Sequence, residues 1–214
     1  MDAYSTLEST KQSLLIIENR TRYDIVVGVP HHAPAGVPYL PCPEHCDSDE
    51  NTGFIGRHLA EQLDCCSLIA CNSSIDPNKH LSSDYTMQIA AWRPSVLIEI
   101  HGHGKVSSKY DVEISCGSAV QTEYSEELAA LVNRKLSEDA DFANVSVCGC
   151  FSDLYFRATK TLTITDPRWF AYHIELSPPL RKPGNGLSGR PTEFAYKFAD
   201  YLAGAILERH DKGH

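Results

Sequence analysis

Short apolar runs alternate with longer amphipathic segments along the chain. The runs are rich in β-branched residues and predict strands at 13–18, 24–30, 66–71, 95–101, 110–115, 144–149 and 170–176. Between them, apolar residues recur at helical spacing and predict helices at 52–64, 82–92, 123–138 and 190–209. This interleaving predicts an α/β fold in which helices cover both faces of a mixed, mostly parallel sheet.

Length and charge narrow the class of protein. A chain of 214 residues can bury a full core, so we expect a single domain over 1–214. The start MDAYSTLESTKQS resembles no signal segment and no apolar run reaches membrane-spanning length, so we expect a cytoplasmic protein with no membrane partner. A net charge of −9 argues against nucleic acid as a partner. Whether the chain forms a homo-oligomer stays open.

Metal-ligand residue types gather where the predicted strands end or a helix begins. The segments are VVGVPHH (26–32), DENTG (49–53) and LIEIHGHG (97–104). Ligands bind at the carboxyl edge of open α/β sheets, and catalytic zinc is commonly held by two histidines and a carboxylate. The pattern therefore predicts a mononuclear zinc hydrolase.

The histidines offer more than one choice of ligand. His31 and His32 are adjacent, so either can serve. On the strand LIEIH, Glu99 and His101 share one face, and His103 extends that face beyond the strand. Glu99 therefore supports a ligand histidine or is a core acid in an ion pair.

The carboxylate ligand is Asp49 or Glu50, which both precede the predicted helix 52–64. Acidic residues are also favoured at that place by capping and by the helix dipole. We prefer Glu50 as the ligand and keep Asp49 as a supporting residue.

Glu175 is the candidate general base. On FAYHIEL it shares a face with His173 and is flanked by apolar residues, which makes its ionised form costly without a partner. Such environments are typical of general bases. An ion pair with Arg181 is the competing interpretation.

Five short motifs together resemble a known family. PH (30–31), DEN (49–51), IDPNK (75–79), IEIHGHG (98–104) and HIEL (173–176) are similar, in this order, to landmarks of the N-formylglutamate amidohydrolases. The wider group includes poly-γ-glutamate hydrolases and zinc carboxypeptidases. The resemblance implies a zinc-exopeptidase architecture of the phosphorylase/hydrolase-like kind. It also implies Zn²⁺-dependent hydrolysis of an N-acyl amino acid or a γ-glutamyl amide.

The resemblance also implies roles for single residues. It implies zinc ligands at His31, Glu50 and His101, and a catalytic glutamate at Glu175. Asn78 and Lys79 would anchor the carboxylate of a small anionic amide substrate. Independently of the resemblance, Arg57, Arg157 or Arg181 are candidates to assist Lys79, or are solvated surface charges. Lys79 stands where the family has arginine, and PHHAPAG replaces PHxG, which keeps His32 as a rival. DPNK is also a common turn sequence.

The eight cysteines are expected to be reduced thiols. In PCPEHC, Cys42, His45 and Cys46 suggest a second, structural metal, but they lack a fourth ligand, so a proline-rich loop is favoured. A thiol hydrolase that uses Cys116 or Cys148 with His103 is one alternative function. A non-catalytic metal-binding or sensor domain of the same fold is another. RKPGNGLSGR (181–190) is interpreted as either a lid or an ordinary surface loop.

Overall fold

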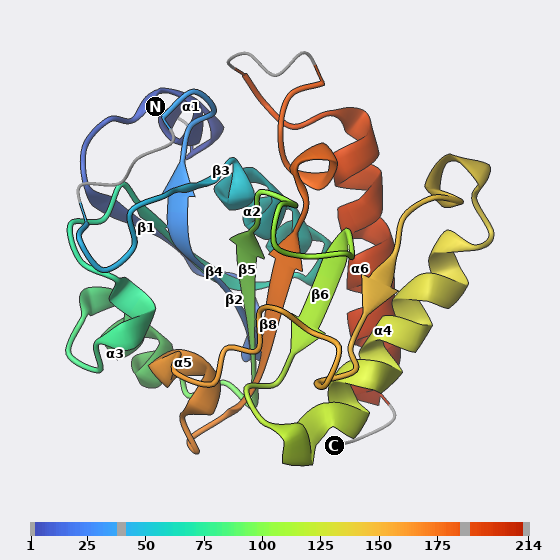
Figure 1. Ribbon diagram of the computed structural model, residues 1–214. Helices are drawn as coiled ribbons and strands as arrows, with labels where there is room; N and C mark the ends of the chain where they lie inside the picture. Colours follow the sequence, from blue (N-terminus) through green and yellow to red (C-terminus); the bar gives the residue numbers. More distant parts are fainter. Residues whose placement is uncertain (1–2, 38–41, 185–188, 212–214) are drawn as a thin grey trace.

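A mixed eight-stranded sheet forms the centre of the molecule (Figure 1). The computed structural model describes residues 3–37, 42–184 and 189–211. The strands are β1 (Leu14–Glu18), β2 (Arg22–Ala33), β3 (Asp49–Glu50), β4 (Cys65–Cys71), β5 (Val96–Gly102), β6 (Val112–Ser115), β7 (Val147–Cys148) and β8 (Phe170–Leu176). Their order is β1-β4-β2-β5-β8-β6-β7, and β3 pairs with β2. Strand β1 is antiparallel to β4 and β6 to β8, whereas the other pairings are parallel.

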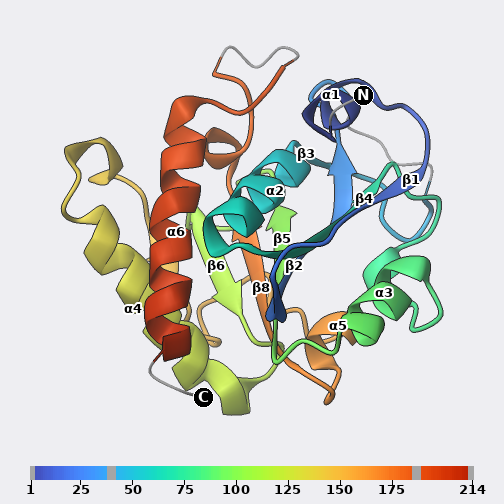
Figure 2. The same cartoon turned by 180° about the vertical axis from the view of Figure 1, so that it is seen from behind.

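Helices cover both faces of this sheet, as Figures 1 and 2 show from opposite sides. They are α1 (Ala3–Ser9), α2 (Thr52–Leu63), α3 (Asp84–Trp92), α4 (Thr122–Leu136), α5 (Leu162–Thr165) and α6 (Glu193–Asp211). Helices α2, α4 and α6 contribute to the core on one face, and α3 and α5 to the core on the other. The predicted α/β architecture with a mixed sheet is confirmed.

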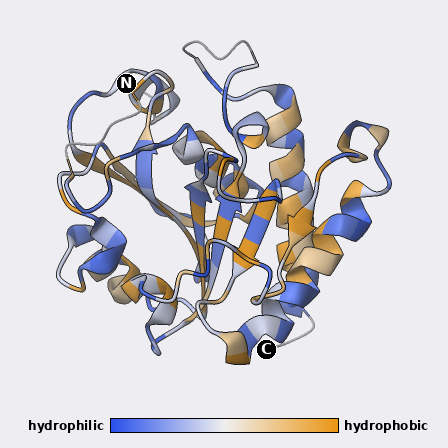
Figure 3. Cartoon of the chain, viewed as in Figure 1, coloured by the Kyte–Doolittle hydropathy of each residue, from blue (hydrophilic) through white to orange (hydrophobic). Residues whose placement is uncertain are grey.

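The two cores explain why the central strands are almost continuously apolar. Neighbouring residues of a strand point to opposite faces, so Val26 and Leu97 pack towards α3, while Val27 and Ile98 pack towards α2 and α6. Figure 3 shows apolar residues concentrated in the sheet and on the helix surfaces that face it.

One sheet face turns polar towards the carboxyl ends of β5 and β8. On the face of α3 and α5, Leu97 is followed by Glu99 and His101, and Ala171 is followed by His173 and Glu175. All four polar side chains are buried. In Figure 1, α3 and α5 lie low in the view, and the arrowheads that mark the carboxyl ends of β5 and β8 point upwards.

Two further predictions concern the chain's surroundings and its loops. Among the described residues, no helix has both the length and the apolar character needed to cross a bilayer. The segment 181–190 contains residues 185–188, which lie outside the described residues, and its interpretation as a lid or a surface loop stays open.

Candidate metal centre

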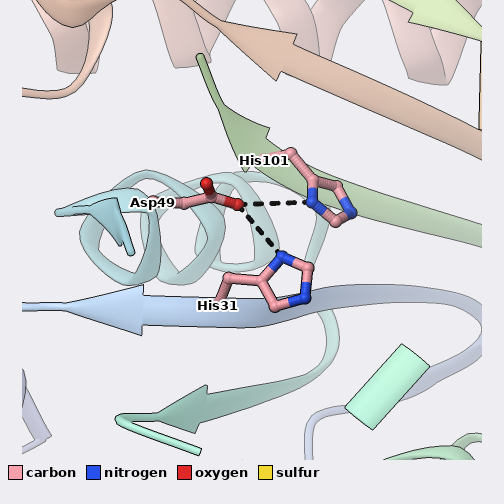
Figure 4. A group of neighbouring side chains, drawn as sticks. All are labelled: His31, Asp49 and His101. Carbon is pink, nitrogen blue, oxygen red and sulfur yellow. Dashed lines mark hydrogen bonds and ion pairs between the residues drawn. The ribbon is translucent and has the colours of Figure 1, made fainter. Parts of the chain in front are cut away.

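Three side chains converge at the carboxyl ends of β2 and β5. The Nδ1 atoms of His31 and His101 each lie 3.3 Å from the same oxygen, Oδ2 of Asp49 (Figure 4). All three side chains are buried, with 3–4% of their residue surface exposed. Two imidazole nitrogens and a carboxylate oxygen that meet at one point form a typical zinc donor set.

Buried carboxylates fix the far side of both imidazoles. His31 Nε2 lies 2.9 Å from Asp76 Oδ1, and His101 Nε2 lies 3.4 Å from Glu99 Oε2. Both nitrogens of each ring thus face a carboxylate, and in a neutral imidazole that binds a metal through Nδ1 the outer carboxylate would hold the hydrogen on Nε2. Metal-binding histidines are usually oriented in this way by an outer carboxylate.

The cluster shifts the pKa values of its own members. Burial would lower the pKa of His101, but its hydrogen bonds to Asp49 and Glu99 outweigh burial and raise that pKa to about 10. Burial would raise the pKa of Asp49, yet the hydrogen bonds from His101 and His31 hold it well below its usual range. Asp49 is therefore an ionised carboxylate, which is the form that binds a cation.

A β-bulge decides which of the adjacent histidines enters the cluster. The pairing of β2 with β4 shifts register between Val29 and His32. In strict alternation His31 would share the face of Val29 and point towards α2, but the bulge turns it to the other face. His32 instead faces α2, where Nδ1 accepts from the backbone N–H of Gly53 and Nε2 lies 3.0 Å from the carbonyl oxygen of Leu7. Both ring nitrogens of His32 are thus used by the backbone.

The structure places Asp49, and not Glu50, between the two histidines. These residues are neighbours in β3, and their side chains point in different directions. The Glu50 carboxylate forms an ion pair with Lys182, and its Oε1 accepts from the backbone N–H of Gly36 at 2.9 Å. The structure therefore does not bring Glu50 together with His31 and His101, and it brings Asp49, expected as a supporting residue, to them instead.

The side chains of His103 and Arg181 form hydrogen bonds with backbone groups. His103 Nε2 donates to the carbonyl of Asp111 at 3.3 Å, while its Nδ1 accepts from the N–H of Lys105. The buried Arg181 guanidinium donates to three carbonyl oxygens, those of Glu50, His103 and Leu176. It packs on Gly102, where an added Cβ would lie 2.3 Å from Arg181 Nε. Glycine at the end of β5 therefore leaves room for an arginine that ties neighbouring chain segments together.

The DPNK segment contacts His31 directly and is linked to His101 through Glu99. Its residues Pro77–Lys79 form a 3₁₀ turn, and Asp76 before the turn contacts His31. Asn78 donates through Nδ2 to Glu99 Oε2 at 3.2 Å, and Lys79 Nζ lies 2.6 Å from Asp76 Oδ2. Sequence reasoning assigned roles to Asn78 and Lys79 and missed Asp76, although a carboxylate in a loop after strand β4 was a usable signal.

A second group lies next to the first and contains Glu175. His101, His173 and Glu175 are close enough together to hold an ion, and the rings of His101 and His173 overlap with centroids 4.2 Å apart. Burial raises the pKa of Glu175 to about 8 and lowers that of His173 well below its ordinary value. Among the described residues, Glu175 Oε2 and His173 Nδ1 have no hydrogen-bond partner. These are unused polar atoms within contact distance of the cluster.

The cysteines provide neither a second metal site nor an activated nucleophile in the described part of the chain. Cys42 is buried and Cys46 exposed, while the His45 ring stacks on His31 with centroids 3.7 Å apart. The two possible metal-binding groups found among the described residues include none of these three. Burial raises the pKa of Cys116 to about 12 and also raises that of Cys148. A thiolate mechanism is therefore disfavoured.

Solved structures with similar folds belong to amide hydrolases and related proteins. No family model matches this sequence, and no curated protein matches it. A bacteriophage poly-gamma-glutamate hydrolase matches with a TM-score of 0.59 and 16% identity, over 98% of this chain and 96% of that chain. An N-formylglutamate amidohydrolase from Ralstonia eutropha JMP134 matches with a TM-score of 0.56 and 14% identity, over 94% and 99%. A zinc-free YndL protein matches with a TM-score of 0.60 and 14% identity, over 91% and 89%. At these identities the likeness shows that the chain shares their fold over nearly its full length.

Proposed function

We propose that this protein is a zinc-dependent amidohydrolase, with the metal held by His31, Asp49 and His101. The observation that carries the proposal is the convergence of two Nδ1 atoms on Asp49 Oδ2, each at 3.3 Å, while buried carboxylates hold both Nε2 atoms. Nitrogen and carboxylate donors suit zinc, and a set of three leaves a further coordination position for a reactant. When bound, zinc would lower the pKa of water and polarise the carbonyl of the scissile amide.

Glu175 is the proposed general base. It lies on β8 beside His101, and its Oε2 has no hydrogen-bond partner among the described residues. A pKa raised to about 8 gives its carboxylate a useful basicity near neutral pH. Glu175 would remove a proton from the attacking water as the water oxygen bonds to the carbonyl carbon. The same carboxyl group would then deliver that proton to the nitrogen as the carbon–nitrogen bond breaks.

For the substrate we propose an N-acyl amino acid of the N-formylglutamate type, or a γ-glutamyl amide. The sequence motifs resemble the family that acts on such compounds, and two proteins that share the fold are named for these substrates. Both compounds are small anionic amides. The scissile bond is the N-acyl amide in the first and the γ-glutamyl amide in the second.

Metal removal and reconstitution test this function. Protein stripped with a chelator should lose hydrolysis of N-formylglutamate and of γ-glutamyl oligomers, and one equivalent of zinc should restore it. Hydrolysis that persists without metal would overturn the proposal. A zinc-loaded protein that cleaves neither compound would instead support the non-catalytic metal-binding alternative.

A further inference from the structure

One short segment is linked to both metal-site histidines, to His31 directly and to His101 through Glu99. Asp76, which precedes the turn Pro77–Lys79, lies 2.9 Å from His31 Nε2 through Oδ1. Asn78, within the turn, donates to the same Glu99 oxygen that lies 3.4 Å from His101 Nε2. The turn therefore supports His31 through one carboxylate and His101 through another.

Lys79 pairs with the buried carboxylate of Asp76, which would be destabilised without this cation. Asp76 is fully buried, and its Oδ2 lies 2.6 Å from Lys79 Nζ. Within residues 3–37, 42–184 and 189–211, no other side chain pairs with this oxygen. A substrate carboxylate that drew Lys79 away would leave a buried negative charge half-paired, which is strongly destabilising. Lys79 is thus held to Asp76 whether or not a substrate is bound.

Asn78 is held in place by the bond between its amide and Glu99. Its Nδ2 donates to Glu99 Oε2 at 3.2 Å, whereas its buried Oδ1 has no partner among the described residues. Turning the amide over would place Oδ1 against the Glu99 carboxylate, where two acceptors repel each other. Tyr85 donates to the other Glu99 oxygen at 2.9 Å, so Glu99 is held from two sides.

We propose that Lys79 and Asn78 are positioning residues of the metal site. Lys79 holds Asp76, which keeps the Nε2 hydrogen of His31 in place and aims its Nδ1 at Asp49. Asn78 does the same for His101 through Glu99. This inference rests on the metal centre of the proposed function and is independent of the substrate.

Zinc affinity in the absence of substrate tests the assignment. The measurement is competition with a chromogenic chelator, on the full chain, for the parent and for Lys79→Met and Asn78→Ala. Outer-shell partners of metal-binding histidines typically contribute about 10–100-fold to affinity, so we expect weakening of that size in both variants. Lys79→Arg should restore most of the affinity, because it keeps a cation beside Asp76. Thermal unfolding of the metal-free proteins checks that each variant folds.

Lys105→Met is the matched control. Lys105 is also a partly exposed ammonium paired with a carboxylate near the site, 2.7 Å from Asp111, but Asp111 contacts no ring of the cluster through its carboxylate. Its zinc affinity should equal that of the parent. Parental affinity in folded Lys79→Met and Asn78→Ala would overturn the inference, as would a parent that binds no zinc. A parent that binds zinc but hydrolyses no amide would contradict only the proposed activity.

Discussion

Replacing Glu175 with glutamine should separate catalysis from metal binding. The glutamine side chain has nearly the same shape but cannot take a proton from water. A positioned general base commonly contributes ~10²–10⁴ in rate, so Glu175→Gln should lose hydrolysis by about that factor. Because Glu175 lies outside the trio of His31, Asp49 and His101, the variant should still bind one zinc per chain.

The same substitution should change how stability depends on pH in the metal-free protein. Burial raises the pKa of Glu175 from its ordinary 4.5 to about 8, so the folded state holds a proton that the unfolded state has lost between these values. Folding stability therefore falls as pH rises through this window. A difference of about 3.5 pKa units corresponds to ~5 kcal/mol as an upper limit. Glutamine does not titrate, so Glu175→Gln should gain stability relative to the parent as pH rises from 5 to 8.

Urea unfolding at pH 5, 6, 7 and 8 with a chelator present measures this effect. The control is Glu50→Gln. Burial would raise the pKa of Glu50, but its hydrogen bond with Lys182 outweighs burial, and the pKa of Glu50 is lowered. The stability that Glu50 contributes is lost only as pH falls below its ordinary pKa, so this variant should differ from the parent by a constant amount between pH 5 and 8. A constant difference for Glu175→Gln as well would refute the burial argument. Hydrolysis at the parental rate would refute its role as a base.

Three further predictions follow from the same geometry. Asp49→Asn should lose stoichiometric zinc by elemental analysis while Glu50→Gln keeps it, and the reverse result would return the ligand role to Glu50. His32→Gln should keep zinc but lose ~1–3 kcal/mol of unfolding free energy in urea, because two backbone groups lose a buried partner. Loss of zinc in this variant would make His32 a ligand instead. Alkylation of the native protein with iodoacetamide should spare hydrolysis, because Cys116 is buried and its pKa is raised to about 12, whereas inactivation in step with modification would revive the thiol mechanism.

The sequence predicted the layers of the fold because its strongest patterns are long. Seven apolar runs and four amphipathic segments all became strands and helices within a few residues of the expected bounds. The pattern missed β3, α5 and α1, which have two, four and seven residues. Elements this short contain at most about two periods of their own repeat, so hydrophobic periodicity does not reveal them. Strand β3 nevertheless carries Asp49.

Ligand types were predictable at the ends of strands, but the face to which each residue points was not. The choice between His31 and His32 depends on the bulge in β2, which reverses the alternation after Val29. One signal for this bulge was present in the sequence. Pro30 has no backbone N–H to donate to a neighbouring strand, and proline inside a buried strand is typical of a bulge. Reading Pro30 in this way favours His31.

The contacts of Lys79 were harder to predict, because a sequence does not show which cations the protein itself needs. The metal edge buries Asp49, Asp76, Glu99 and Glu175 in a chain whose net charge is −9. Each buried carboxylate that stays ionised requires a partner, so nearby donors are bound to the protein before any substrate arrives. Lys79 meets this need at Asp76. A lysine near a predicted metal site should therefore be matched first with the buried acids around it, before a role in substrate binding is considered.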